Sequence, residues 1–350
     1  MPLYNSIQLN GKIYSANNID QFEQIEEWQK HIAAFLKEWF DTTSTVFVNT
    51  SGSTGTPKNI ELNKQSMVNS AKATIEYFGL TPSTQALLCL PASHIAGKMM
   101  LVRAIVGNFN LICTQPSKQP FSSIATNIHF AALTPYQLSY SLTDIQKKKP
   151  HTIILGGAAT PTPLSDAIQN QSTAFYETYG MTETCSHIAV KRINGTHKSD
   201  NFRTLKDIQI RLNEQNCLCI YAPQIHNKEL ITNDIAEIIN KSEFRIIGRL
   251  DNVINSGGIK IHPEQIEKKL DAVINRPFFV GSLPDPNLGQ KVVLVIEGNP
   301  FDKMTEKDLV LKIADLLTPF EKPKEIKYCS SFIRTASNKL QKKESLDISV

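Results

Sequence analysis

The chain has 350 residues, of which 41% are hydrophobic and 20% are charged, so it can bury a large core and is not expected to be disordered. Its formal charge of +4 comes from dispersed lysines without interleaved aromatic residues, which argues against nucleic-acid binding. It has no apolar run of the roughly 18 residues that span a membrane, no signal-peptide profile and no metal-ligand spacing among its six cysteines, so we expect a cytoplasmic protein with reduced thiols.

The first motif in chain order is the loop TSGSTGTPKN at residues 50–59. It follows a strand-like stretch at 44–49 and precedes a helix-like stretch at 66–79, so we expect it to join a strand to a helix. Glycines that admit a close backbone approach, hydroxyl donors and one lysine suit a polyphosphate. These residues are Ser51, Gly52, Ser53, Thr54, Gly55 and Lys58. The spacing is not that of the P-loop, because Pro57 precedes the lysine, and a flexible surface turn is the alternative.

Strand-like and helix-like runs alternate from about residue 40 to 190. The strand-like runs begin near residues 86, 109, 127, 151 and 173, and the helix-like runs near 98, 139 and 162. This alternation predicts a layered α/β domain with a mostly parallel sheet. From 205 to 250 the short strands predict an antiparallel piece, and a compact α+β segment follows. We therefore place a boundary near Asp251, with one domain over 1–250 and another over 251–350.

A second motif, YGMTE, stands at the end of a strand-like run. Tyr179 and Gly180 close the run, and Thr182 and Glu183 follow it. In an open α/β sheet, ligands collect where loops leave the carboxyl ends of the strands. An aromatic ring there can stack on a base, and a carboxylate can hold the Mg²⁺ of a polyphosphate. The alternative is that Tyr179 belongs to the core and Glu183 caps a helix.

Further stretches of polar residues or glycine follow in the chain. They contain Asp234, Arg249 with Asp251, the pair Gly257-Gly258, and Lys339 in the segment RTASNK. In this order, and together with the two earlier motifs, they resemble the motif series of the acyl-adenylate-forming ligases, the superfamily of acyl-CoA synthetases, luciferases and peptide-synthetase adenylation domains. The resemblance covers residues 50 to 342, and the shared order makes it specific although each motif alone is weak.

The resemblance implies a large adenylating domain of layered α/β sheets, a small mobile α+β domain, ATP with Mg²⁺, CoA as co-substrate and a carboxylic acid as substrate. The loop at 50–59 would bind the β- and γ-phosphates. The residues implied around AMP are Gly156, Gly157, Ala158, Tyr179 and Gly180 at adenine, Asp234 at the ribose with Arg249 close by, Thr182 at the α-phosphate and Glu183 on Mg²⁺. Lys339 would bridge the attacking carboxylate and the α-phosphate, where negative charge builds up in the transition state.

The resemblance also implies a domain swing between two half-reactions. Asp251 matches the hinge, and rotation would withdraw Lys339 and bring the Gly257-Gly258 turn to the active site, where the thiol of CoA attacks. Asn59, Asn233 and Asn338 stand where such ligases usually have glycine. We interpret them as composition drift, because asparagine tolerates left-handed backbone angles best after glycine. Few residues precede the phosphate loop, so we expect much of the usual N-terminal subdomain to be absent.

Residues around the acyl pocket narrow the resemblance further. The stretches LPASHIAGKMMLVRA and YGMTETCSHI are most similar to the o-succinylbenzoate–CoA ligases of menaquinone biosynthesis. In those ligases a basic residue stands nine positions after the residue matching His94, which implies that Arg103 binds the aromatic carboxylate. Lys98 is a rival, and on a helix it points about 140° away from Arg103. A structural Asp or Glu partner, or a surface-directed guanidinium, is the alternative for Arg103.

Two other functions stay open. One is an acyl- or aryl-CoA ligase for a different acid, and the other is a catalytically silent adenylate-binding protein. The residues Lys58, Glu183, Asp234 and Lys339 argue against the silent protein, whereas Asn338 beside the catalytic lysine motivates it. The partners expected are therefore a carboxylic acid, ATP and CoA, and the oligomeric state is not predicted.

Overall fold

The computed structural model of the chain describes residues 4–50, 58–334 and 340–350. Its strands form a large sheet, a smaller second sheet and a separate hairpin. Neighbouring strands of the large sheet follow the order β12 (Gln209–Leu212), β13 (Cys217–Tyr221), β14 (Leu230–Asn240), β15 (Glu243–Arg249), β11 (Phe202–Thr204), β10 (His187–Arg192), β9 (Ala174–Gly180), β8 (Thr152–Leu155), β7 (Phe130–Leu133), β5 (Gln85–Leu88), β6 (Asn110–Cys113), β1 (Ser6–Leu9) and β2 (Lys12–Ser15).

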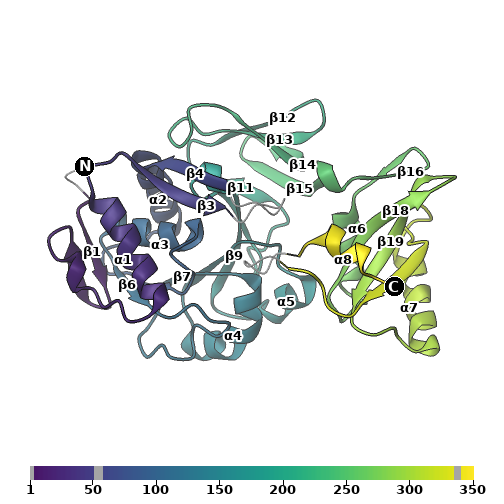
Figure 1. Cartoon of the computed structure of the whole chain (residues 1–350), viewed down its shortest axis with the longest axis horizontal. Helices are drawn as coiled ribbons and strands as arrows, with labels where there is room; N and C mark the ends of the chain where they lie inside the picture. Colours follow the sequence, from purple (N-terminus) through teal and green to yellow (C-terminus); the bar gives the residue numbers. More distant parts are fainter. Residues whose placement is uncertain (1–3, 51–57, 335–339) are drawn as a thin grey trace.

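The large sheet is parallel through β6, β5, β7, β8 and β9, and it becomes antiparallel from β10 onward. This confirms the layered α/β class, and it shows that the antiparallel piece continues the same sheet. The helices that accompany it are α1 (Glu27–Phe40), α2 (Lys64–Phe78), α3 (Ile95–Gly107), α4 (Pro135–Lys148) and α5 (Thr162–Ala167), with a 3-10 turn η1 (Ile19–Gln21) before α1. Figure 1 shows them around the strands of the left-hand lobe.

Successive side chains of the central strands point to opposite faces of the sheet, so each strand contributes to two hydrophobic cores. Ala86, Leu88 and Phe130 point to the face covered by α2 and α3. Leu87 and Ala131 point to the opposite face, which α4 covers. A sheet covered on both faces needs strands that are apolar throughout, and β5, β7 and β8 are buried along almost their whole length.

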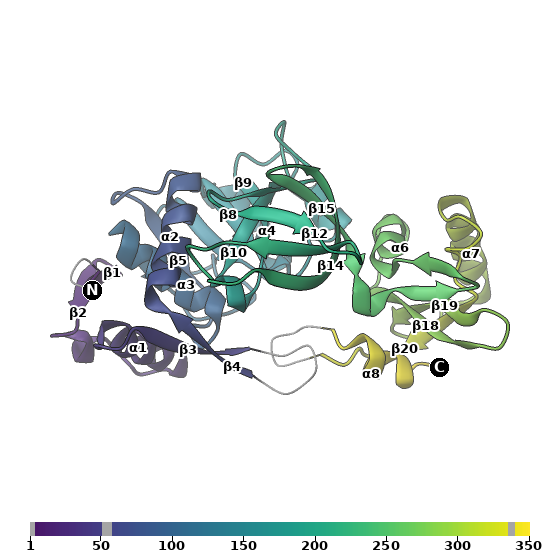
Figure 2. The ribbon, with the colours of Figure 1, turned by 90° about the horizontal axis from the view of Figure 1, so that it is seen from above.

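The loop at 50–59 does not join a strand to a helix, so that expectation is wrong. It lies between the hairpin strands β3 (Thr45–Thr50) and β4 (Lys58–Asn63), and α2 begins only at Lys64. Val46 pairs with Leu62 and Val48 with Ile60, which gives the hairpin one apolar face. β4 contributes only two apolar positions, Ile60 and Leu62, which are too few to reveal the two-residue period in the sequence. Figure 2 shows the open ends of β3 and β4 pointing toward the other lobe.

The second sheet forms the right-hand lobe of Figure 1. It contains β17 (Ile259–Ile261), β16 (Ile254–Ser256), β19 (Gly289–Glu297), β18 (Phe278–Asp285) and β20 (Glu325–Cys329), together with α6 (Pro263–Leu270), α7 (Lys303–Leu316) and α8 (Lys342–Asp347). This lobe has its own apolar clusters. The two sheets meet in sequence at the 3-10 turn η3 (Leu250–Asn252), so Asp251 stands between them, and its role as a hinge stays a prediction. Among the described residues, no helix is long and apolar enough to cross a membrane.

Helix α3 is buried on nearly all sides and carries Arg103. Its first turn touches the backbone that precedes it, because a Cβ built on Gly97 would lie 2.2 Å from the Pro91 carbonyl oxygen. Glycine at this position therefore sets where the helix, and with it Arg103, lies in the core.

We expect Gly97→Ala to lower the free energy of unfolding of the large lobe by about 1–3 kcal/mol, because the added methyl group overpacks a rigid backbone contact. Urea unfolding followed by tryptophan fluorescence measures this, since both tryptophans, Trp28 and Trp39, lie in α1. Gly281→Ala is the control: a Cβ there makes only ordinary contacts at 3.5 Å, and Gly281 lies in the other lobe. An unchanged transition in Gly97→Ala would contradict this account.

Candidate active site

Three of the predicted nucleotide residues meet at one end of the large sheet. The Tyr179 hydroxyl, at the end of β9, donates a hydrogen bond of 2.6 Å to Asp234 Oδ2 on β14. Arg249 on β15 places Nη1 at 3.8 Å from Asp234 Oδ1, and the two residues are paired in the strand register. Burial, followed by the charge of Asp234, raises the pKa of Tyr179, so its hydroxyl stays a donor at neutral pH.

The ring of Tyr179 is part of an aromatic cluster. Its centroid lies 5.3 Å from that of Phe244 on β15 and 5.8 Å from that of Phe202 on β11. The two readings of Tyr179, core residue and nucleotide residue, are therefore compatible: the ring packs against neighbouring strands while the hydroxyl reaches Asp234.

The turn after β8 lies beside the end of β9. A Cβ on Gly156 would lie 3.0 Å from Thr178 Oγ1, and Gly157 has a φ of +90° that favours glycine. Thr178 holds the turn by donating to the Leu155 carbonyl oxygen at 2.8 Å. Gly157 and Ala158 are exposed, so the backbone of this turn is open to a ligand next to Tyr179.

The chain bends sharply between β9 and β10. A Cβ on Gly180 would lie 2.2 Å from the Ser186 carbonyl oxygen, so only glycine fits at this close approach. The bend contains the 3-10 turn η2 (Thr182–Thr184), which strand β4 contacts. Glu183 is exposed, and no hydrogen bond or ion pair within the described ranges 4–50, 58–334 and 340–350 uses its carboxylate. The topology thus brings the strand that begins at Lys58 beside Thr182 and Glu183.

Several predicted residues lie outside what the structure describes. They are Ser51, Gly52, Ser53, Thr54, Gly55 and Lys339. The side chain of Lys58 is likewise outside the described part of the structure. The flanks of Lys339 are described: Arg334 and Leu340 form an antiparallel bridge. The two lobes contact each other where the backbone N–H of Thr162, at the start of α5, donates to Asp271 Oδ2 at 3.0 Å.

The predicted hinge and the predicted CoA-side turn are separate from that contact. Asp251 is exposed, and it accepts hydrogen bonds from Asn233 Nδ2 at 3.1 Å and Arg249 Nη2 at 3.0 Å. Gly257 and Gly258, with φ of +60° and +85°, make the tight turn between β16 and β17. In Figure 1, β16 lies at the top of the small lobe, away from β9, so the structure does not bring this turn to the nucleotide residues.

Arg103 lies behind the β9–β10 bend and is 2% exposed. Its Nη2 donates to Ser186 Oγ at 2.6 Å and lies 3.4 Å from His187 Nδ1, while Nη1 faces the Met100 sulfur at 3.6 Å. Its buried Nε has no partner, and no described carboxylate lies within ion-pair distance of the guanidinium. Burial lowers the pKa of Arg103 to about 9, which leaves the side chain charged at neutral pH.

Lys98 and His94 face a different neighbour, helix α1. Lys98 Nζ lies 3.6 Å from Glu38 Oε2 and 4.6 Å from the centroid of the Phe35 ring. His94 directly precedes α3, and partial burial of its ring, followed by the proximity of His31 on α1, lowers its pKa. The structure therefore brings Arg103, and not its rival Lys98, to the bend that carries Thr182 and Glu183.

Sequence reasoning missed two polar residues that adjoin Arg103 and one that adjoins the second of them. Ser186 lies at the end of the bend, His187 begins β10, and Thr74 on α2 contacts the far side of the His187 ring. The available signal was His187 itself, a polar residue at the start of an apolar strand run whose first positions are all buried.

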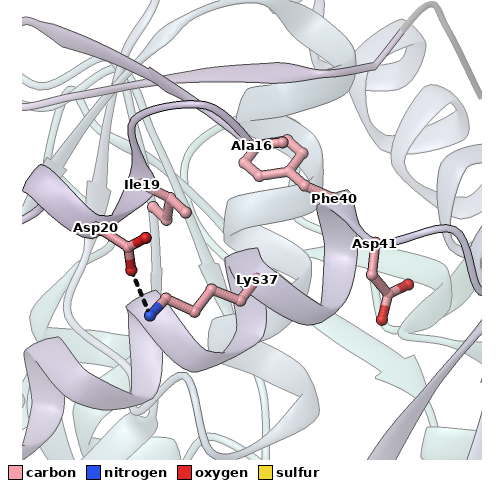
Figure 3. A pocket seen from close by; sticks show the side chains of 6 residues that line it. All are labelled: Ala16, Ile19, Asp20, Lys37, Phe40 and Asp41. Atoms are coloured by element: carbon pink, nitrogen blue, oxygen red, sulfur yellow. Dashed lines mark ion pairs between the residues drawn. The ribbon is translucent and has the colours of Figure 1, made fainter.

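A hollow of about 270 Å³ lies elsewhere, between α1 and the segment before it (Figure 3). Its lining includes Asp20 and Lys37, whose charges already pair at 2.6 Å. Asp41, which also lines the hollow, pairs with Lys64 at 2.7 Å. Because these charges are paired and none of the predicted site residues that the structure describes lines the hollow, we do not assign the active site to it.

The comparison with known proteins agrees with the nucleotide site that the geometry suggests. The family described as AMP-binding enzyme matches residues 9–212. The 2-succinylbenzoate–CoA ligase of Salmonella typhimurium is 27% identical over 84% of this chain and 67% of its own length, and that of Haemophilus influenzae is 30% identical over 78% and 64%. The chain thus spans about two thirds of the length of these curated relatives.

Solved structures agree. An acyl-CoA synthetase (AMP-forming)/AMP-acid ligase II-like protein from Dyadobacter fermentans is 34% identical, with a TM-score of 0.64, and the match covers 95% of this chain and 98% of that one. The o-succinylbenzoate CoA synthetase of Bacillus subtilis, solved with its acyl-adenylate intermediate, is 20% identical over 85% of this chain and 68% of that one, with a TM-score of 0.74, and shares the fold. With more than half of its residues matched by the family and a relative of almost equal length at 34% identity, the chain belongs to the AMP-binding enzyme family.

Proposed function

We propose that the chain is an ATP-dependent ligase that activates a carboxylic acid as acyl-AMP and transfers the acyl group to CoA, with o-succinylbenzoate as the acid. Family membership and the names of its relatives support the reaction class. The observation that carries the choice of acid is Arg103, a buried cation without a carboxylate partner among the described residues, next to the bend that carries Thr182. We place the reaction in the cytoplasm, where ATP and CoA are available.

The nucleotide fits the cluster around Asp234. A carboxylate can accept two ribose hydroxyls, and among the described residues Asp234 Oδ1 faces no closer partner than Arg249 at 3.8 Å. Adenine would lie between the Tyr179 ring and the open backbone of residues 156–158. Arg249 also forms an ion pair with Asp251 at 3.0 Å. This arginine therefore links the proposed ribose site to the proposed hinge.

The phosphates would lie between η2 and the hairpin β3–β4. Mg²⁺ prefers oxygen ligands and commonly takes one or two carboxylates together with phosphate oxygens, so the exposed Glu183 fits as its protein ligand. The bound ion would neutralise charge on the phosphates. Thr182 can donate its hydroxyl to the α-phosphate, and Lys58 with the glycine-rich loop would bind the β- and γ-phosphates.

The first half-reaction forms a bond between a carboxylate oxygen of the acid and the α-phosphorus, and it breaks the bond from that phosphorus to pyrophosphate. Lys339 would stabilise the negative charge on the attacking carboxylate and on the α-phosphate. In the second half-reaction the CoA thiol loses its proton and bonds to the acyl carbon, and AMP leaves with the electron pair of the carbon–oxygen bond. A swing about Asp251 would exchange Lys339 for the Gly257-Gly258 turn between the two steps.

The acid that we propose has two carboxylates with separate roles. The succinyl carboxylate reacts, and the ring carboxylate needs a fixed cation. Arg103 meets that need because a buried guanidinium without an anion is costly, and an incoming carboxylate offsets the cost. Lys98 does not, because Glu38 already lies beside it.

Arg103→Ala should reduce kcat/KM for o-succinylbenzoate roughly 10- to 150-fold, the effect of losing one charge-assisted hydrogen bond. 4-Phenyl-4-oxobutanoate, which lacks the ring carboxylate, should be nearly unaffected. Pyrophosphate release with each acid, followed by thioester formation with CoA, measures both. Equal losses for the two acids would make Arg103 structural. Strong activity of the unaltered protein on a different acid would show that this other acid is the substrate. Absence of activity on every acid would favour a catalytically silent adenylate-binding protein.

Lys339→Ala should abolish most acyl-AMP formation and spare thioester formation from acyl-AMP supplied in advance. The reason is that the proposed swing removes this lysine before the thiol attacks. The two half-reactions are measured separately, by pyrophosphate release and by CoA consumption. Lys343→Ala, an exposed lysine near the same end of the chain, serves as the control. Equal losses in both half-reactions would show that the lysine acts throughout or that the variant misfolds.

A further inference from the structure

The side chain of His187 lies between Arg103 on α3 and Thr74 on α2. This histidine is 5% exposed and begins strand β10. Its Nδ1 lies 3.4 Å from Arg103 Nη2 and 3.3 Å from Ser186 Oγ, and its Nε2 lies 3.2 Å from Thr74 Oγ1 on α2. Both ring nitrogens thus have polar neighbours although the residue is buried.

The chemistry of these neighbours fixes the proton on the ring. A guanidinium has donors only, so the Nδ1 that faces Arg103 must accept and the proton must lie on Nε2. Nε2 then donates to Thr74 Oγ1, and the Thr74 hydroxyl is free to donate to the Ser70 carbonyl oxygen at 3.1 Å. The resulting chain runs without conflict from Arg103 through His187 and Thr74 to the backbone of α2.

We propose that His187 is a positioning residue that directs Arg103 toward Ser186 through a neutral acceptor, so that the guanidinium keeps its full charge for a carboxylate of the acyl substrate. The proposal rests on the proposed function for the identity of that carboxylate. An Asp or Glu in place of His187 would hold the guanidinium equally well, but it would also neutralise it. A neutral imidazole provides the orientation without the competing charge.

The surroundings of His187 support a neutral ring. Arg103 from α3 is the one charged group on the described chain that affects it, while α2 contributes Thr74 and the bend contributes Ser186. Burial, followed by the positive charge of Arg103, places the pKa of His187 well below its usual range. Protonation would remove the acceptor and set two cations against each other.

The selectivity test uses o-succinylbenzoate and 4-phenyl-4-oxobutanoate as a matched pair. His187→Glu should raise KM for o-succinylbenzoate roughly 10- to 150-fold with little change in kcat, as expected when binding shared by ground and transition state is lost. The monocarboxylate should change little. His187→Gln retains one acceptor and one donor and should preserve most of the preference, and His197→Gln at an exposed position is the matched control.

A second test does not depend on the substrate. In ¹⁵N-histidine NMR spectra, the signals that disappear in His187→Gln should show a proton on Nε2 and a ring that stays neutral at pH values where a free histidine is protonated. Arg103→Met should raise the pKa of His187 by removing the neighbouring charge. A neutral ring with its proton on Nδ1, or an imidazolium that forms in the pH range of a free histidine, would overturn the proposal. So would a folded His187→Glu that leaves the preference between the two acids unchanged, whereas a failure of the unaltered protein to use o-succinylbenzoate would overturn only the proposed function.

Discussion

The burial of one guanidinium, that of Arg103, is the constraint on which the acyl side of the structure depends. A charged group removed from water costs several kcal/mol unless it is paired, yet its described partners are a hydroxyl, an imidazole and a thioether. The apolar packing of α3 against the sheet supplies the stability that offsets this cost. This internal cation, which no described carboxylate neutralises, is the basis of the proposal that an anion from outside binds here.

The topology of the sheet explains why this cation lies near the nucleotide residues. β9 is the last parallel strand, and its carboxyl end delivers Tyr179 toward Asp234. The chain then turns back through η2 into antiparallel β10, which starts at His187. One bend therefore separates the proposed nucleotide side from the proposed acyl side, and Gly180 permits the bend because no side chain fits against Ser186. The reacting carboxylate and the α-phosphate would meet at Thr182, between the two sides.

Much of this arrangement could be predicted from the sequence, and the omissions have physical causes. The apolar strands and periodic helices between residues 40 and 190 are visible because burial on both faces leaves long apolar runs. Strand β4 was missed because its apolar positions, Ile60 and Leu62, are too few to reveal a two-residue period. The hydrogen bond between Tyr179 and Asp234 was not predicted, and only the family resemblance implied that both lie around AMP, since no spacing in the sequence connects residues that are joined by strand order.

The choice between Lys98 and Arg103 shows what side-chain geometry adds. Helical spacing indicated that the two point in different directions, but not which one faces the ligand. The structure gives Lys98 a carboxylate from α1 and gives Arg103 none among the described residues. His187 received no role from the sequence, because a sequence does not show that a histidine touches an arginine on another element.

The most direct test of the central claim is a calorimetric comparison of two non-hydrolysable acyl-AMP mimics on the unaltered protein. One carries the o-succinylbenzoyl group and the other is identical except that it lacks the ring carboxylate. If Arg103 is reserved for that carboxylate, the first should bind at least about 10-fold more tightly, as a charge-assisted contact requires. Equal dissociation constants would show that the buried guanidinium does not meet the substrate, and would contradict the account.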